Sequence, residues 1–231
     1  MSESRLPDES AEYRKLRHEL LEAEIALKEQ VTRVAALRRQ LPADTTVADY
    51  ELQEGPRNLA EDAPGAPVRL SELFEDPEKP LILIHFMYGG AQTNPCPMCS
   101  MWADGYNAVA RHVRDRANFA LVAEATVDEM RRWARERGWS ELRLVSSLGS
   151  SLKQDLRMQD PDGSQHPGVS IFTRAADGTP RHFYTAEAVL APGHWNGVDL
   201  LSPVWNLFDL TPDGRGDWFP KLRYSTAATA P

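Results

Sequence analysis

The sequence predicts an α/β protein that has a mixed β-sheet flanked by helices and a long α-helical arm at its N-terminus. Three observations lead to this fold class. The first 41 residues carry one apolar stripe at helical spacing. From residue 80 onward, apolar strand-like runs alternate with helix-like stretches in the order β-α-β-α-β, which is typical of parallel strands with crossover helices. Two further runs, 168–174 and 180–184, flank an Asp-Gly dipeptide, as in an antiparallel hairpin.

The composition and net charge indicate which classes of protein the chain can belong to. The chain has 231 residues, of which 42% are hydrophobic and 26% charged, so it is long enough and apolar enough to bury a core. Its formal net charge of -8 argues against nucleic acid or an anionic membrane as partner, because phosphates require a positive surface. We find neither a run of about 20 apolar residues nor an apolar signal segment, and therefore expect a cytoplasmic protein.

The first expected element is a helix over residues 8–41. Asp8 or Ser10 can cap its start, and Pro42 stops it. The apolar stripe consists of Leu16, Leu20, Ala23, Leu27, Val31, Val34, Leu37 and Leu41. A stripe this narrow packs either on the chain's own domain or on a second subunit. We assign residues 1–42 to a helical arm and expect it to support a homodimer.

Residues 43–79 are rich in proline, glycine and acidic side chains, which predicts an extended connector. Short elements are expected near 47–52 and over 68–73. The main domain is assigned to residues 80–224, and residues 225–231 are expected to be a disordered tail.

Within the main domain each element has a local signal. The run 81–88 is continuously apolar and β-rich, which is typical of a strand buried on both faces. A capping box at Thr126 and Glu129 begins a helix that Gly138 ends. The remaining expected elements are a helix over 97–116, strands over 119–124 and 142–146, the hairpin described above and a final helix over 202–208.

The two cysteines, Cys96 and Cys99, lie in the segment Asn-Pro-Cys-Pro-Met-Cys, between a strand and a helix start. Unpaired backbone N–H groups and the helix dipole favour negative charge there, so we expect the pKa of Cys96 to be lowered. Cys99 follows three residues later, within reach for a disulfide. A nucleophilic thiol beside a resolving thiol is what thiol–disulfide exchange requires. The alternative is two buried cysteines that act as small apolar side chains.

With this placement the chain resembles the thioredoxin-like superfamily, whose members carry a cis-proline before the hairpin, facing the cysteine pair. Here Pro167 precedes the strand 168–174, and the following Phe and Asp-Gly match the family's order. The resemblance therefore implies a cis bond at Pro167 and a place for this proline beside Cys96 and Cys99. The chain departs from thioredoxin at Pro95, which replaces a Trp, and in the Pro-Met between the cysteines.

A more specific resemblance is to an uncharacterised bacterial branch of this superfamily, domain of unknown function 899, which is related to the peroxiredoxin-type thioredoxin-like proteins. It covers nearly the whole chain. The matching stretches are RRQLP (38–42), HFMYG (85–89), CPMCSMWADG (96–105), RGW (137–139), VSS (145–147), HFYT (182–185) and FDLTPDGR (208–215). The resemblance supports the fold more strongly than it supports any one activity.

Further residues are candidates for the site. Asp104, in the matching block after the cysteines, is a candidate proton acceptor for the resolving thiol, and Trp102 either packs beside Cys99 or caps a pocket. Strand alternation would place His182 and Tyr184 on one face, where they either line a substrate pocket or pack as half-buried rings. By contrast, we expect His85 to be a core histidine and Arg215 to be a turn residue.

Three activities follow from these residues. The first is a thiol–disulfide oxidoreductase that acts through Cys96 and Cys99, without a dissociable cofactor, on a protein or small-molecule disulfide with a cellular thiol as reductant. The second is a copper site, or a zinc site with a fourth ligand, formed by Cys96 and Cys99 with His166 or His182. His166 precedes Pro167 and is otherwise a solvated loop residue. The third is a thiol peroxidase in which Cys96 becomes a sulfenic acid.

Overall fold

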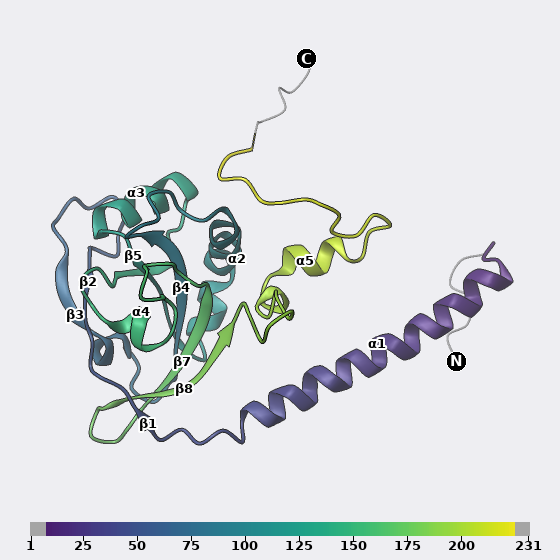
Figure 1. Ribbon diagram of the computed structural model, residues 1–231, viewed down its shortest axis with the longest axis horizontal. Helices are drawn as coiled ribbons and strands as arrows, with labels where there is room; N and C mark the ends of the chain where they lie inside the picture. Colours follow the sequence, from purple (N-terminus) through teal and green to yellow (C-terminus); the bar gives the residue numbers. More distant parts are fainter. Residues whose placement is uncertain (1–7, 225–231) are drawn as a thin grey trace, which may run out of the picture. The chain divides into compact units, whose positions relative to one another are not determined.

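The computed structural model describes residues 8–224, and the expected tail at 225–231 lies outside the described residues. The chain divides into two compact units, residues 1–42 and 43–231. The first unit contains helix α1 (Ala11–Arg38) (Figure 1). The helix begins at Ser10, whose side chain accepts a hydrogen bond from the backbone N–H of Tyr13 at 3.0 Å. The expected helical arm is therefore present, with its N-cap at one of the two candidate positions.

The second unit is built on one mixed sheet of eight strands in the order β1-β8-β7-β4-β5-β6-β2-β3 (Figure 1). The strands are β1 (Thr45–Thr46), β2 (Glu51–Glu54), β3 (Ala66–Arg69), β4 (Leu81–Gly89), β5 (Asn118–Glu124), β6 (Arg143–Ser146), β7 (Gly168–Arg174) and β8 (Pro180–Glu187). Strands β4, β5 and β6 run parallel, whereas β7 is antiparallel to both β4 and β8. The predicted α/β class, with parallel strands followed by a hairpin, is confirmed.

The second unit contains four α-helices and two 3-10 helices within the described residues. They are α2 (Pro97–Arg114), α3 (Val127–Arg137), α4 (Leu152–Asp155), α5 (Pro203–Phe208) and the 3-10 helices η1 (Leu70–Leu73) and η2 (Asp199–Leu201). Thr126 and Glu129 form the predicted capping box of α3, and Gly138 ends the helix in the left-handed region at φ 72°. Within residues 8–224, no helix has the length and apolar character needed to span a bilayer.

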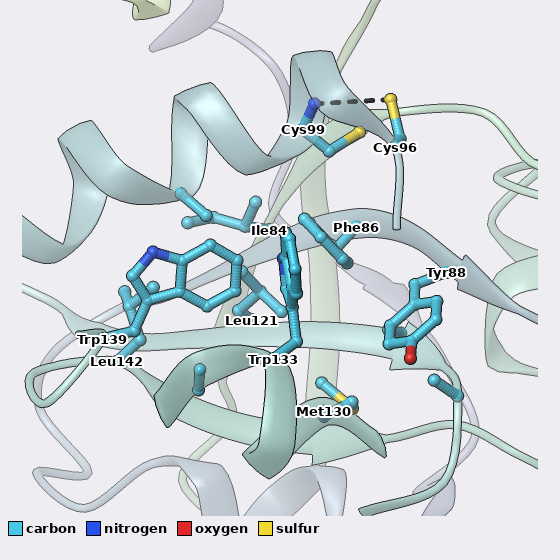
Figure 2. Close-up of a cluster of buried hydrophobic side chains, with 14 of the residues drawn as sticks. Ile84, Phe86, Tyr88, Cys96, Cys99, Leu121, Met130, Trp133, Trp139 and Leu142 are labelled. Carbon is cyan, nitrogen blue, oxygen red and sulfur yellow. Dashed lines mark hydrogen bonds between the residues drawn. The ribbon is translucent and has the colours of Figure 1, made fainter. Parts of the chain in front are cut away.

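Strand β4 is buried on both faces, as its continuous apolar sequence predicts. On one face, Ile84 and Phe86 pack against side chains of α2 and α3, including Trp133 (Figure 2). On the other face, Leu81 and Leu83 pack into a second cluster formed with residues of η1, α4 and β7. Because both cores meet on this strand, the chain that leaves its end is held in a fixed position.

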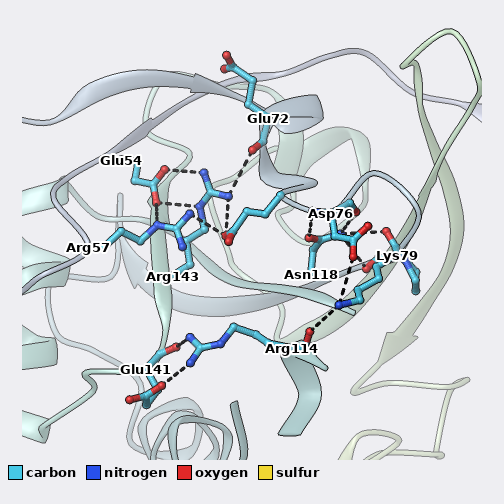
Figure 3. A network of polar contacts seen from close by, with 11 residues as sticks. Glu54, Arg57, Glu72, Asp76, Lys79, Arg114, Asn118, Glu141 and Arg143 are labelled. Atoms are coloured by element: carbon cyan, nitrogen blue, oxygen red, sulfur yellow. Dashed lines mark hydrogen bonds and ion pairs between the residues drawn. The ribbon is translucent and has the colours of Figure 1, made fainter. Parts of the chain in front are cut away.

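The segment 43–79, expected as a connector, contributes β1, β2 and β3 to the sheet instead. Strand β2 pairs antiparallel with β6, and Leu52 is buried in the second cluster. Arg143 on β6 forms a two-point contact with Glu54 on β2, at 2.8 and 2.7 Å, and also contacts Glu75 at 3.2 Å (Figure 3). Strand β2 has only four residues, and Leu52 is the only apolar one among them. So short a strand shows no alternation of apolar and polar residues, which explains why the sequence of this segment looks irregular.

Candidate active site

The cysteine pair lies at the start of α2, directly beyond β4. Cys96 is the N-cap residue in an extended conformation, and Pro97 occupies the first helical position, where its missing N–H costs no hydrogen bond. The backbone N–H of Cys99 points at Cys96 Sγ at 3.4 Å, so the sulfur takes the place of the usual capping oxygen (Figure 2). Both cysteines are free thiols, with exposed fractions of 6% for Cys96 and 3% for Cys99.

The end of β4 is shaped to receive this helix start. Its pairing with β5 shifts register between His85 and Gly89, so the backbone groups between them are free for other contacts. The carbonyl oxygen of Met87 accepts the N–H of Cys96 at 3.0 Å, and the backbone of Met87 also hydrogen-bonds the Cys99 sulfur. Gly89 is in the left-handed region at φ 88°, and a Cβ there would collide with the backbone of Ala125.

A buried hydrogen-bond chain fixes the carbonyl group of Cys96. Ser100 Oγ donates to the Cys96 carbonyl oxygen at 2.9 Å, and Trp133 Nε1 on α3 donates to Ser100 Oγ at 3.2 Å. Because Ser100 is fully buried and Trp133 packs in the core of α2 and α3, the first turn of α2 is anchored to a second helix. The reactive sulfur is thus held by rigid elements and not by a flexible loop.

The two sulfurs have opposite pKa shifts. The pKa of Cys96 is lowered to about 7, chiefly by the hydrogen bond from the Cys99 thiol and further by the backbone N–H groups of Cys99 and Met98, against the effect of burial. The pKa of Cys99 is raised well above its ordinary value, because its thiol proton bonds to Cys96, because it is buried and because the Cys96 thiolate is negative. At pH 7 roughly half of Cys96 is therefore thiolate, whereas Cys99 holds its proton.

Asp104 and Trp102 lie further along α2 than the cysteines. Asp104 follows Cys99 by five residues, about 140° further around a helix, and its carboxylate binds Arg137 and accepts the Trp139 Nε1–H at 2.8 Å. Asp104 thus joins α2 to the end of α3. Trp102 is buried at 6% exposure, but it belongs to neither of the two core clusters. Within residues 8–224, the buried Nε1–H of Trp102 has no hydrogen-bond partner.

His182 and Tyr184 do not share a face, contrary to the alternation argument. In the pairing of β8 with β7, His182 is opposite Phe172 while Tyr184 is opposite Ile171, so an extra residue of β8 forms a bulge between them. His182 accordingly bonds Thr185, three residues on, at 2.8 Å. Since Phe172 belongs to the second cluster, His182 faces away from the side of the sheet on which the cysteines pack.

The bond before Pro167 is trans, because residues 8–224 contain no cis peptide, and the implied cis-proline is therefore corrected. An antiparallel bridge between Gln159 and Gln165 and a 2.9 Å bond from the His166 N–H to the Met158 carbonyl lead the chain into β7 along an extended path. Such a path accommodates the ordinary trans isomer without a tight turn. Pro167 still directly precedes the strand that pairs with β4.

The residues do not fit the alternative metal site. The ring of His166 bonds Asp160 at 2.8 Å, and His182 lies across the sheet from the cysteines, as described above. In the described part of the chain, no three His, Cys, Asp or Glu side chains are grouped closely enough to hold a metal ion. Within residues 8–224, neither His166 nor His182 is placed to complete a site of two cysteines and one histidine.

Two titratable groups near the pair, Lys153 and Tyr106, were not expected there from the sequence. Lys153 on α4 is 1% exposed and lies in the electrostatic field of Cys99. Tyr106, also on α2, has its pKa raised to about 12 by burial and by the negative charge of Cys99. His85, expected in the core, is 1% exposed and bonds Ser170 at 2.8 Å. The four residues of α4 are too few to show a period, so Lys153 had no signal in the sequence.

Several solved structures of known proteins are similar to this one. The structure is similar to the mitochondrial 2-Cys peroxiredoxin of Plasmodium falciparum, at 17% identity over 73% of this chain and 95% of that chain, with a TM-score of 0.46. It is also similar to Mycobacterium tuberculosis AhpC (14% identity, 70% and 89%, TM-score 0.45) and to the Plasmodium falciparum antioxidant protein, a 1-Cys peroxiredoxin (13%, 64% and 84%, TM-score 0.48). No curated protein sequence matches.

These likenesses are of low identity and say nothing of the roles of Cys96 and Cys99. A match of the sequence to a protein family is more specific than these structural likenesses. Residues 3–227 match the family described as "Bacterial protein of unknown function (DUF899)", and the chain belongs to this family.

Proposed function

We propose that the protein is a thiol–disulfide oxidoreductase with Cys96 as nucleophile and Cys99 as resolving thiol. One observation carries the proposal: the Cys96 sulfur caps α2 and accepts the N–H of Cys99 at 3.4 Å. The same contacts lower the pKa of Cys96 to about 7 and raise that of Cys99. A thiolate at neutral pH next to a protonated partner is the division of roles that disulfide exchange requires.

The reaction balances with these two residues. The Cys96 thiolate attacks one sulfur of a substrate disulfide, a mixed disulfide forms, and the first substrate thiolate leaves with the electron pair of the broken S–S bond. Cys99 then loses its proton and attacks Cys96 Sγ, which expels the second substrate thiolate and closes the Cys96–Cys99 disulfide. The two protons given up by the cysteines end on the two released thiols. The substrate is reduced by two electrons, and a cellular thiol restores the enzyme.

The partners follow from this chemistry. The substrate class is a protein or small-molecule disulfide, and the reductant is a thiol of the same compartment, which we take to be the cytoplasm. The reaction needs no dissociable cofactor. The helical arm at residues 1–42 is proposed to hold two copies together as a homodimer, because an apolar stripe at heptad-like spacing is suited to a helix of a second subunit.

Trapping the mixed disulfide tests the proposal. Full-length protein, Cys99→Ser and Cys96→Ser are each incubated with oxidised glutathione, and the intact masses are measured. We expect Cys99→Ser to retain one glutathione on Cys96, and the wild type to end as the internal disulfide, lighter by two hydrogens. Cys96→Ser should react far more slowly, because its remaining thiol is buried and protonated.

A second oxidant separates disulfide exchange from peroxidase chemistry. With hydrogen peroxide in place of glutathione disulfide, Cys99→Ser would accumulate a sulfenic acid on Cys96 if peroxide were the preferred oxidant. Equal reactivity of Cys96→Ser and Cys99→Ser toward glutathione disulfide would overturn the proposed roles.

A further inference from the structure

Lys153 is a fully buried cation in the region of the cysteine pair, and the reaction described above does not use it. We propose that Lys153 is a positioning residue whose ammonium group stabilises the thiolate of Cys99 while the mixed disulfide is resolved. This inference rests on the proposed function and assigns the residue that controls its second step.

The position of Lys153 is set by two neutral acceptors. Its Nζ donates to the carbonyl oxygen of Phe86 on β4 at 3.1 Å and to the side-chain oxygen of Gln165. No carboxylate in the described residues forms an ion pair with it, so its charge is buried without a direct counter-ion. A buried unpaired ammonium is costly to a fold, and a group of opposite charge that forms beside it lowers that cost.

One peptide group connects Lys153 to the resolving thiol. The Phe86 carbonyl that binds Lys153 and the N–H of Met87 belong to the same planar trans peptide and point in opposite directions. The backbone of Met87 hydrogen-bonds the Cys99 sulfur and lowers the pKa of its thiol. An ammonium ion on the carbonyl side polarises this peptide and strengthens its N–H as a donor to sulfur. Lys153 therefore acts on Cys99 both through space and through the Phe86–Met87 peptide.

The charges around Lys153 support the ammonium form. Burial lowers the pKa of Lys153 to about 8, against the effects of Cys99 and Glu124, so at pH 7 most of the side chain is charged. His85 is kept neutral, because burial first and then the charges of Lys153 and His182 hold its pKa well below the usual value. From its own helix, Cys99 faces the thiol of Cys96 and the phenol of Tyr106.

Stabilisation of the Cys99 thiolate is needed only after Cys96 has formed the mixed disulfide. Cys96 then carries no negative charge, and Cys99 has lost both its hydrogen-bond acceptor and its repulsive neighbour. Lys153 and the Met87 N–H remain to favour the thiolate that must attack Cys96 Sγ. Removal of the charge should therefore slow the second step and leave the first step nearly unchanged.

Ellman's reagent, an aromatic disulfide, separates the two steps. In the full-length wild type, attack by Cys96 releases the first thionitrobenzoate, and attack by Cys99 on the mixed disulfide releases the second. Stopped-flow absorbance is recorded from pH 6 to pH 10 for the wild type and Lys153→Met. Gln159→Leu, which removes a nearby buried hydrogen bond to Glu124 but no positive charge, is the matched control.

We expect Lys153→Met to leave the first phase within twofold, to slow the second phase by more than twofold at pH 7 and to move its pH midpoint upward. Gln159→Leu should leave both phases within twofold. An unchanged second phase, or a slower one with the same pH midpoint, would overturn the role of Lys153. A wild type that releases only one equivalent would instead refute the proposed function. If Lys153→Met fails to fold, Lys153→Gln, whose amide can still donate to Phe86, replaces it under the same criteria.

Discussion

Replacement of Cys99 by alanine isolates the interaction that makes Cys96 reactive. The hydrogen bond from the Cys99 thiol is the largest of the effects that lower the pKa of Cys96 to about 7. Cys99→Ala removes this donor but keeps the backbone N–H groups at the start of α2, including that of residue 99 at 3.4 Å. The pKa of Cys96 should therefore rise, and its reactivity should move to higher pH.

The size of the effect can be scaled against an ordinary cysteine. With a pKa of about 7, roughly half of Cys96 is thiolate at pH 7. At the ordinary cysteine pKa of about 8.5, the thiolate fraction is roughly 3%, so a Cys96 returned to that pKa would react about fifteenfold more slowly. Since the backbone donors remain, we expect Cys99→Ala to slow the reaction about three- to tenfold at pH 7.

Alkylation with iodoacetamide between pH 5 and pH 10, followed by mass spectrometry of the peptide that contains Cys96, measures this pKa. Cys99→Ser is the matched control, because its hydroxyl can still donate to Cys96 Sγ and should keep the midpoint close to that of the wild type. If Cys99→Ala and the wild type gave the same midpoint, the helix start alone would set the pKa, and the reasoning from the thiol pair would be refuted.

Three further predictions concern stability and assembly. Ser100→Ala leaves the buried indole N–H of Trp133 without its partner, and it should lower the free energy of unfolding by about 1–3 kcal/mol, measured in urea. Arg143→Met removes the two-point contact with Glu54, which keeps only Arg57 as a partner, and it should cost roughly 1–3 kcal/mol; an unchanged urea midpoint would contradict this. In sedimentation velocity, the full chain should be a dimer and Leu20→Lys a monomer, and a monomeric wild type would refute the homodimer.

Much of the fold could be predicted because its signals are local. The apolar run of β4, the proline and cysteine at the start of α2, and the capping box at Thr126 each depend on a few adjacent residues. The same local logic predicted Cys96 at a helix start next to a strand end, where the structure places it.

The rest depends on contacts between distant residues. The bulge that turns Tyr184 away from the side of His182 arises from pairing with β7, and strand alternation cannot reveal it. Asp104 was a candidate because of its place in the matching block after the cysteines, whereas Arg137 on α3 and the nearby Trp139 bind its carboxylate. Lys153 reaches the site from 54 residues beyond Cys99, through a helix of four residues that has no pattern of its own.

The most direct test of the central claim is the redox equilibrium of Cys96 and Cys99 in the purified full-length protein. The protein is equilibrated in thiol/disulfide buffers of graded potential, then quenched and alkylated, and the free thiols are counted by mass. We predict one reversible two-electron transition in which both thiols disappear together as an internal disulfide. Independent oxidation of the two thiols, or modification of Cys96 while Cys99 stays free at every potential, would contradict the account.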